Sequence, residues 1–236
     1  DISNWYKANP NLDVSVYKDF IQTEVNKAAN NPVETAGVMV KNFNLWLTNK
    51  IGNLPKYIET EFIKNSMQKI ELTEDRFKDI TCWCGVDLSC TSDLTATATM
   101  IQLDEMYYFF LKYYLPENSR NTGINQFLEW SNQGYIELTE GNVVDYDRVT
   151  NDLVELNKTN EINQISYDPY NSSQWAINTT EAGLFLVQFN QTSTRLNQPL
   201  KELSRLMMKE QIVIQYNPVT EWCFNNAIVK ESNALI

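Results

Sequence analysis

The clearest pattern of hydrophobic and polar positions lies in residues 80–86, where every second residue is isoleucine, cysteine or valine. A period of two predicts a β-strand with one buried face. Asp87 follows at the end of this strand. Residues 94–101 alternate again and are β-prone, and the aromatic-rich run 106–115 comes after them. Together the three stretches predict a β-meander.

Helical and extended patterns alternate in the rest of the chain. In order, they predict a helix capped by Asp145 or Asp147, a strand over 165–167 that ends in Asp168, a helix capped by Ser172 or Ser173, a strand over 184–189, a helix whose first residue is Pro199, a strand over 212–214, and a helix opened by Pro218. A meander followed by crossover strands is typical of an α/β domain with a mixed central sheet.

The first part of the chain has a different pattern. Apolar residues recur at spacings of three and four in 16–29 and 35–47, which predicts two helices. Strand patterns begin only at Phe77. We therefore expect a helical linker or subdomain over residues 1–76 and the α/β domain over residues 77–236.

Composition narrows the class of protein. The chain has 236 residues, of which 43% are hydrophobic, and this is enough for a substantial core. No apolar run reaches the roughly 18 residues that a membrane-spanning helix needs, so we expect no membrane partner. The chain begins with Asp1 rather than Met, and we expect it to be an internal piece of a longer protein.

The cysteine and histidine content excludes several kinds of site. The four cysteines suit neither a disulfide framework nor a zinc site, and predict buried, reduced thiols in a cytoplasmic protein: Cys82, Cys84, Cys90 and Cys223. The chain contains no His, which removes Ser-His, Cys-His and His-based zinc mechanisms. An enzyme of this composition must use carboxylates, Lys, Tyr or a cofactor.

The net charge argues against a dedicated nucleic-acid-binding module. It is −11, with a pI of about 4.5, whereas phosphate binding depends on clustered Lys and Arg. Metal ions that neutralise part of the surface would weaken this objection.

Asp87 and Asp168 each follow the C-terminal end of a predicted strand. If the two strands are parallel neighbours, the carboxylates meet at the edge of the sheet where α/β folds bind ligands. Carboxylate oxygens suit hard divalent cations, and two such ions can activate a water molecule and stabilise the leaving oxygen of a phosphodiester. The alternative is that Asp87 only caps a turn.

Four other charged residues are candidates with two interpretations each. Asp93 could support the residues that bind the metal without binding it directly, or it could belong to a hairpin turn. Asp145 could bind metal or cap a helix. Lys201 and Arg205 lie one helical turn apart and could contact DNA phosphates or form a solvated face.

Several blocks in a particular order and spacing carry a resemblance to a known family. They are Trp5-Tyr6-Lys7-Ala8-Asn9-Pro10-Asn11-Leu12, Asn44-Leu45-Trp46, Gly85-Val86-Asp87-Leu88-Ser89, Thr91-Ser92-Asp93-Leu94-Thr95-Ala96, Thr139-Glu140-Gly141-Asn142-Val143, Asp145-Tyr146-Asp147, Tyr167-Asp168-Pro169-Tyr170-Asn171, and Asn217-Pro218 with Trp222. The chain resembles the large terminase subunit of tailed bacteriophages, from the linker after its ATPase domain through most of its C-terminal nuclease domain.

This resemblance implies a ribonuclease-H-like fold and endonucleolytic cutting of concatemeric double-stranded viral DNA during genome packaging, with Mg²⁺ or Mn²⁺ in a two-metal site. Asp87 and Asp168 match two of the three metal-binding aspartates of the family. The third lies in a C-terminal helix, but no Asp follows Asp168 in this sequence. We therefore expect an incomplete C-terminal end, and a 236-residue chain that cuts DNA poorly on its own.

The resemblance also implies partners and a location. The partners are double-stranded DNA, the ATPase domain of the same polypeptide, the small terminase subunit and the portal protein. The location is the host cytoplasm, with transient binding to the procapsid.

Two other functions remain as alternatives. The chain could be a non-catalytic interaction domain of the packaging motor that binds the portal or the ATPase domain. Residues 87–92 also resemble the first phosphate loop of actin-like and sugar-kinase ATPases. That function would require further glycine-rich loops, and the seven glycines include no Gly-Gly pair and no Asp-x-Gly.

Overall fold

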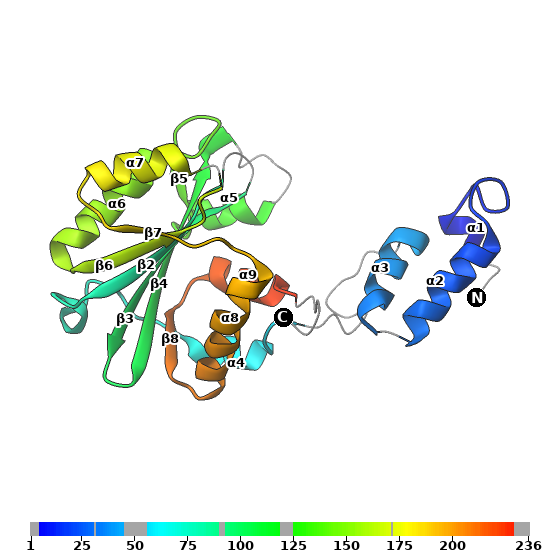
Figure 1. Ribbon diagram of the computed structural model, residues 1–236, viewed down its shortest axis with the longest axis horizontal. Helices are drawn as coiled ribbons and strands as arrows, with labels where there is room; N and C mark the ends of the chain where they lie inside the picture. Colours follow the sequence, from blue (N-terminus) through cyan, green and yellow to red (C-terminus); the bar gives the residue numbers. More distant parts are fainter. Residues whose placement is uncertain are drawn as a thin grey trace. The chain divides into compact units, whose positions relative to one another are not determined.

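The structure is a computed structural model that describes residues 5–30, 32–44, 56–89, 93–118, 125–170 and 172–228. The chain forms two compact units (Figure 1). The first is Asp1–Tyr57 with Ala227–Lys230, and the second is Ile58–Asn226 with Glu231–Ile236. No helix in the described ranges is both long and apolar enough to cross a membrane.

The first unit is helical, as its sequence pattern predicts. Its helices are α1 (Trp5–Ala8), α2 (Lys18–Asn30) and α3 (Pro32–Phe43). Trp5, Leu12 and Ile21 form a small buried cluster, and Ile21 is fully buried. Partly buried residues of α2 and α3 pack against it, so the helices are held together by one apolar stripe.

The second unit contains a mixed sheet and its helices. Along the chain these are α4 (Thr60–Ser66), β1 (Met67–Gln68), the short 3₁₀ helix η2 (Asp75–Phe77), β2 (Cys82–Asp87), β3 (Thr95–Leu103), β4 (Met106–Pro116), α5 (Asn125–Asn132), β5 (Glu137–Thr139), α6 (Tyr146–Thr159), β6 (Ile162–Tyr167), α7 (Ser173–Glu181), β7 (Leu186–Gln188), α8 (Ser193–Met208), β8 (Ile212–Gln215) and α9 (Pro218–Asn226). The predicted meander and the later crossover strands are all present.

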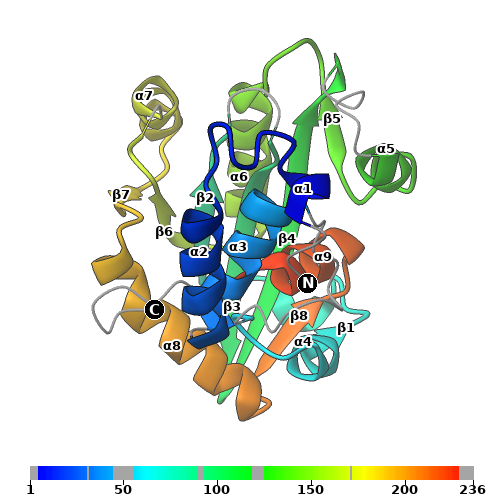
Figure 2. The ribbon, with the colours of Figure 1, turned by 90° about the vertical axis from the view of Figure 1, so that its right-hand side faces the viewer.

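The strands lie in the order β1-β8-β4-β3-β2-β6-β7, with β5 paired to β4. β2, β3 and β4 are antiparallel neighbours, whereas β6 and β7 continue the sheet parallel to β2. On the other side, β8 is parallel to β4 and β1 is parallel to β8. Figure 2 shows α4, α8 and α9 near β8.

The two faces of the sheet differ because side chains alternate along each strand. On the face that we call the α6 face, Cys84 and Val86 of β2 pack with Val149 and Leu153 of α6. On the opposite face, which we call the α8 face, β2 carries Gly85 and Asp87. A large core therefore covers the α6 face of β2, whereas the α8 face is open beside the end of β2.

The structure corrects two boundaries. Residues 58–76, which the sequence pattern assigns to the helical region, belong to the second unit, because Ile63 and Ile70 are buried there and β1 pairs with β8. Pro199 is not the first residue of its helix but lies inside α8. The helix begins earlier because the Thr192 side chain caps it by accepting from the Arg195 amide, at 3.4 Å.

Candidate active site

Asp87 and Asp168 lie together at the ends of neighbouring parallel strands. The β2 and β6 strands are in register up to the pair Val86 and Tyr167, and each aspartate is the next residue of its strand or the loop that follows. Neighbouring strands are about 4.8 Å apart, so this register places the two backbones side by side. Both aspartates line one pocket of about 270 Å³ on the α8 face.

The carboxylate of Asp87 is electrostatically crowded. Although Asp87 is exposed at the rim of the pocket, partial burial of its carboxyl raises its pKa above the usual 3.8. The negative charges of Asp168 and Asp93 raise the pKa further. A hydrogen bond from Gln191 Nε2 to Asp87 Oδ1, at 3.3 Å, acts in the opposite direction. A cation at this position would relieve the crowding.

A tight turn fixes the backbone at Asp168. Its Oδ1 accepts from the Tyr170 amide at 2.9 Å, and its backbone carbonyl accepts from Ser172 Oγ at 2.5 Å. Ser172 is almost completely buried and is the N-cap residue of α7, without a side-chain bond to the helix. The start of α7 therefore holds Asp168 in place against the end of β2.

Asp93 lies at the start of the segment that leads into β3. Its Oδ1 accepts from the adjacent Leu94 amide at 2.9 Å, which is a turn interaction. Its charge nevertheless contributes to the raised pKa of Asp87. The loop between β2 and β3 is anchored at Ser89, whose amide donates to Thr95 Oγ1 at 2.9 Å and whose carbonyl accepts from Tyr146 Oη at 3.1 Å.

The remaining sequence candidates lie elsewhere. Asp145 caps α6 and accepts from the amides of Asp147 and Arg148, so it is a helix cap. Lys201 and Arg205 lie on α8, on its exposed side. Among the described residues, no group of three or more His, Cys, Asp and Glu side chains is arranged to hold a metal ion.

Gln191 is the site residue that the sequence pattern did not indicate. It comes shortly after β7, which is parallel to β6, so three successive parallel strands bring residues to the same edge. The signal that could have identified it is its position after the predicted strand 184–189. An amide side chain supplies a neutral oxygen as well as the N–H donor, and carbonyl oxygens are common ligands of hard cations.

The pocket beside the carboxylates has a floor of small residues. Gly85, Ala96, Ala98 and Ser166 line it, and a methyl group at Gly85 would have no atom within 4 Å. Phe189 and Leu196 complete the lining. The small floor leaves room for a bulky group to approach both aspartates from the α8 face.

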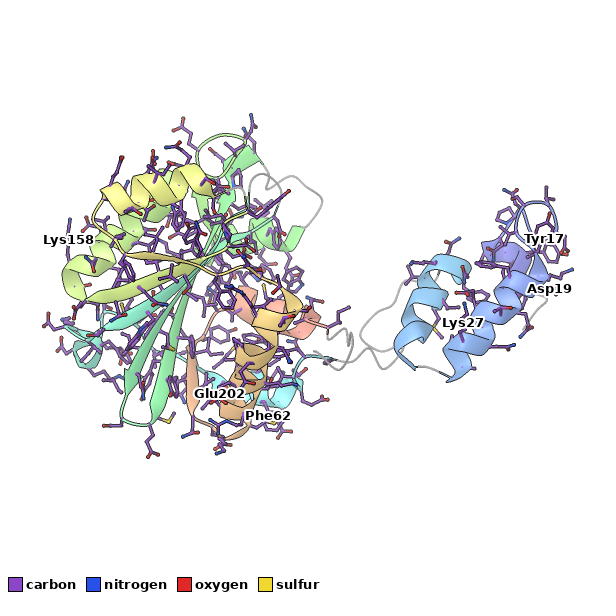
Figure 3. The ribbon with its side chains drawn as sticks, in the orientation of Figure 1. Tyr17, Asp19, Lys27, Phe62, Lys158 and Glu202 are labelled. Atoms are coloured by element: carbon purple, nitrogen blue, oxygen red, sulfur yellow. The ribbon has the colours of Figure 1, made fainter. Side chains whose placement is uncertain are left out.

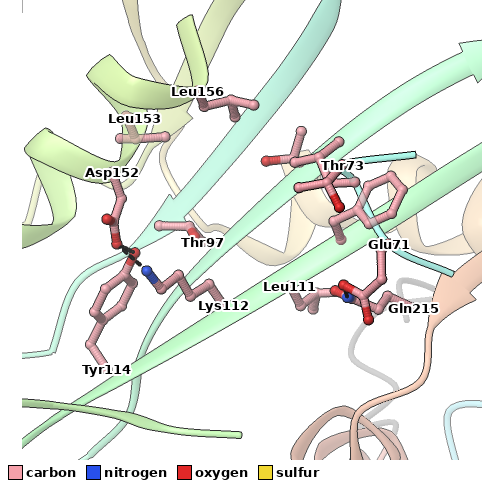
Figure 4. Close-up of a pocket in the computed structure, with 13 residues that line it drawn as sticks. Glu71, Thr73, Thr97, Leu111, Lys112, Tyr114, Asp152, Leu153, Leu156 and Gln215 are labelled. Carbon is pink, nitrogen blue, oxygen red and sulfur yellow. Dashed lines mark hydrogen bonds and ion pairs between the residues drawn. The ribbon is translucent and has the colours of Figure 1, made fainter. Parts of the chain in front are cut away.

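A second pocket, of about 320 Å³, lies on the α6 face (Figure 4). Lys112 and Asp152 form an ion pair at its edge, and Tyr114 Oη donates to Asp152 Oδ2 at 2.7 Å. Glu137 bridges Lys112 and Arg148, and although burial opposes it, these two cations hold the pKa of Glu137 below its usual value. These ion pairs connect β4, β5 and α6, and their opposite charges neutralise one another.

The prediction of buried thiols is confirmed for two of the three cysteines that the structure describes. Cys82 and Cys84 are buried on the α6 face, and Cys223 is partly buried. All three are free thiols. Cys90 lies outside the described residues.

Comparison with known proteins identifies the relatives of this fold. A family model described as "Terminase large subunit, endonuclease domain" matches residues 1–235. Protein YmfN of Escherichia coli (strain K12) is 23% identical over 239 residues, which are 95% of this chain and 51% of YmfN. The large terminase subunit of Enterobacteria phage HK97 is 26% identical over 159 residues, which are 64% of this chain and 32% of that protein.

The structural comparison agrees with the sequence comparison. The crystal structure of the HK97 bacteriophage large terminase matches with a TM-score of 0.67 at 22% identity, over 100% of this chain and 49% of that chain. The chain thus spans about half the length of YmfN and of the HK97 structure. The predicted ribonuclease-H-like fold, with a mixed central sheet flanked by helices, is confirmed.

Proposed function

The chain belongs to the family of terminase large subunit endonuclease domains, and we propose that it is a metal-dependent endonuclease that cuts concatemeric double-stranded DNA during viral genome packaging. The observation that carries the proposal is the meeting of Asp87 and Asp168 at the ends of β2 and β6, on the open face of the sheet. The chain has no His, so carboxylate-bound metal ions suit it better than a His-based mechanism.

The residues at the site fit a divalent cation such as Mg²⁺ or Mn²⁺. Two carboxylates share one pocket, and the pKa of Asp87 is raised first by partial burial and then by the negative charges of Asp168 and Asp93, whose repulsion a cation would remove. Bound there, two metal ions would activate a water molecule and stabilise the oxygen that leaves the phosphodiester. Asp93, close enough to affect Asp87, is the candidate for a supporting carboxylate.

The protein residues have distinct roles in this proposal. Asp87 and Asp168 hold the cations, and the turn through Tyr170 and Ser172 keeps Asp168 in position. Gln191 orients the Asp87 carboxylate through its hydrogen bond. The floor of small side chains lets the sugar-phosphate backbone approach both aspartates.

Cleavage of supercoiled plasmid DNA with Mg²⁺ or Mn²⁺ tests the proposal. Asp87→Asn and Asp168→Asn should each lower the rate about a hundredfold or more, because each removes an anionic ligand of the metal ions. Asp104→Asn is the matched control, since Asp104 is an exposed residue between β3 and β4 and the change in charge is the same. Cleavage that persists in both site variants would contradict the proposal.

The metal site can also be tested without DNA. Mn²⁺ should raise the melting temperature of the unaltered chain, and Asp87→Asn or Asp168→Asn should remove most of this shift. The Asp104→Asn control should keep it. A shift that survives both site substitutions would place the metal elsewhere.

The net charge of −11 favours the alternative of a non-catalytic domain that binds another motor component. Metal-independent binding to a portal or ATPase domain, with neither cleavage nor a Mn²⁺ shift in melting temperature, would support that alternative. In either case, we propose as partners the ATPase domain of the same polypeptide, the small terminase subunit and the portal protein. We propose the host cytoplasm, with transient binding to the procapsid, as the location.

A further inference from the structure

Helix α8 begins beside the two aspartates and leads away from them. Gln191 contacts Asp87 just before the helix starts, and Leu196 in its first turns lines the same pocket. The helix has 16 residues, so at 1.5 Å per residue it is about 24 Å long. A strand of duplex DNA has one phosphate per 3.4 Å, so this length corresponds to about seven phosphates.

The outer side of α8 is basic in a chain that is otherwise acidic. At 100° per residue, the inner side of the helix carries Leu203 and the buried Met207. The opposite side carries three exposed basic residues, Lys201, Arg205 and the C-cap residue Lys209, and the exposed Arg195 lies on the flank of the first turn. We call these four residues the α8 basic stripe. Glu202 is the one acidic residue between the first and last of them.

Most of the α8 basic stripe is unpaired in the part of the chain that the structure describes. Within the described residues, Arg195, Lys201 and Lys209 take part in no ion pair. Arg205 is bound by Glu202, with its Nε and Nη2 atoms 2.8 and 2.6 Å from the two carboxylate oxygens. In contrast, Lys158 of α6 is paired with Glu155.

We propose that the α8 basic stripe binds the phosphate backbone of double-stranded DNA and guides it to Asp87 and Asp168. This inference rests on the proposed nuclease function, since it identifies the substrate-binding surface of the same site. Contacts to phosphates alone carry no sequence information, which suits an enzyme that cuts DNA of any sequence. Glu202 limits the binding because it competes with phosphate for Arg205.

Glu202 provides a test in which binding should increase. Glu202→Gln releases Arg205 and removes the one anion in the stripe, so binding to a short fluorescent duplex should become about fivefold tighter. The matched control is Glu155→Gln, because Glu155 and Lys158 have the same i,i+3 spacing on α6. Figure 3 shows Lys158 and Glu202 in different parts of the second unit. The control should bind as the unaltered chain does.

Loss of positive charge should have the opposite effect. Lys201→Gln with Lys209→Gln should weaken binding about tenfold at low salt, and should flatten the slope of log K against log salt by about two, since each lost phosphate contact removes about 0.9. The control is Lys78→Gln with Lys158→Gln, two exposed residues off α8 with the same total charge change. It should leave the slope nearly unchanged.

These measurements are made in EDTA, so that they do not depend on the metal site. Three outcomes would overturn the inference: equal effects of the stripe and control variants, no measurable duplex binding by the unaltered chain, or equally tight and equally salt-dependent binding of poly-glutamate. The stripe variants should keep the Mn²⁺ shift in melting temperature. A missing Mn²⁺ shift in the unaltered chain would overturn the proposed function and leave the binding result separate.

Discussion

At the scale of single residues, the site depends on an unfavourable arrangement of charge around Asp87. Partial burial, Asp168 and Asp93 all raise its pKa, and one hydrogen bond from Gln191 lowers it. A folded protein that keeps such an arrangement is less stable for it, as is common where residues are placed for function rather than for stability. The pH dependence of stability therefore reports on this arrangement of charge and can be measured without substrate.

The first prediction concerns the pH dependence of stability. The raised pKa means that the folded state binds a proton on Asp87 more tightly than the unfolded state, so stability falls as pH rises from the ordinary value of 3.8 through the raised value. Asp87→Asn removes this loss, and should raise the melting temperature by about 1 to 2 °C at pH 7. The difference should shrink towards pH 4 in melting curves of both proteins. A variant that is less stable at pH 7 would contradict this explanation.

The second prediction concerns Gln191. Gln191→Ala removes the hydrogen bond that lowers the pKa of Asp87, so Mn²⁺ should bind about tenfold more weakly and only at higher pH. Gln191→Glu adds a third carboxylate at the same place, and should bind Mn²⁺ more tightly than the unaltered chain while lowering its melting temperature without metal. Isothermal titration at several pH values measures both. Equal Mn²⁺ affinity in all three proteins would show that Gln191 has no part in the site.

At the scale of secondary structure, the sequence predicts the elements that carry the site. Period-two alternation identifies β2 and β3, and the carboxylates at strand ends indicate Asp87 and Asp168. The sequence does not predict Gln191 as a site residue because no local pattern distinguishes it. Only the order of β2, β6 and β7 in the sheet brings it to Asp87. The predicted start of α8 at Pro199 is wrong because proline is favoured at a first helical position, whereas here Thr192 caps the helix earlier.

The third prediction follows from the interior position of Pro199. Proline cannot donate the hydrogen bond to the carbonyl of Arg195, and its ring crowds that carbonyl, at a cost of about 3 kcal/mol relative to alanine. Replacing the rigid proline ring with alanine also gives the unfolded chain more conformational freedom. This lowers the stability of the folded state by up to about 1 kcal/mol and offsets part of the gain. Pro199→Ala should therefore raise stability by about 1 to 2 kcal/mol in urea unfolding. A destabilised variant would mean that the local geometry at Pro199 is needed for packing of α8.

At the scale of the whole molecule, charge is distributed unevenly. The net charge of −11 repels DNA, and two features oppose this repulsion: cations at the aspartate pair, and the α8 basic stripe. Both belong to the second unit. The first unit contributes a separate small core around Trp5, Leu12 and Ile21.

The last prediction concerns the independence of the two units. Among the described residues, the core of the first unit has few buried side chains and so supports only a few kcal/mol of stability, whereas the second unit has two larger clusters on the two faces of its sheet. Urea should therefore unfold the chain in two steps, with the first unit unfolding first and showing the smaller m-value.

Ile21→Ala should cost about 2 to 4 kcal/mol and leave the first unit largely unfolded in water, with the second midpoint unchanged. Ile165→Ala, an equally buried isoleucine in β6, should shift only the second midpoint. Tryptophan fluorescence and hydrogen exchange would follow the two steps separately. One coincident transition that moves as a whole in both variants would show that the units fold as a single cooperative body.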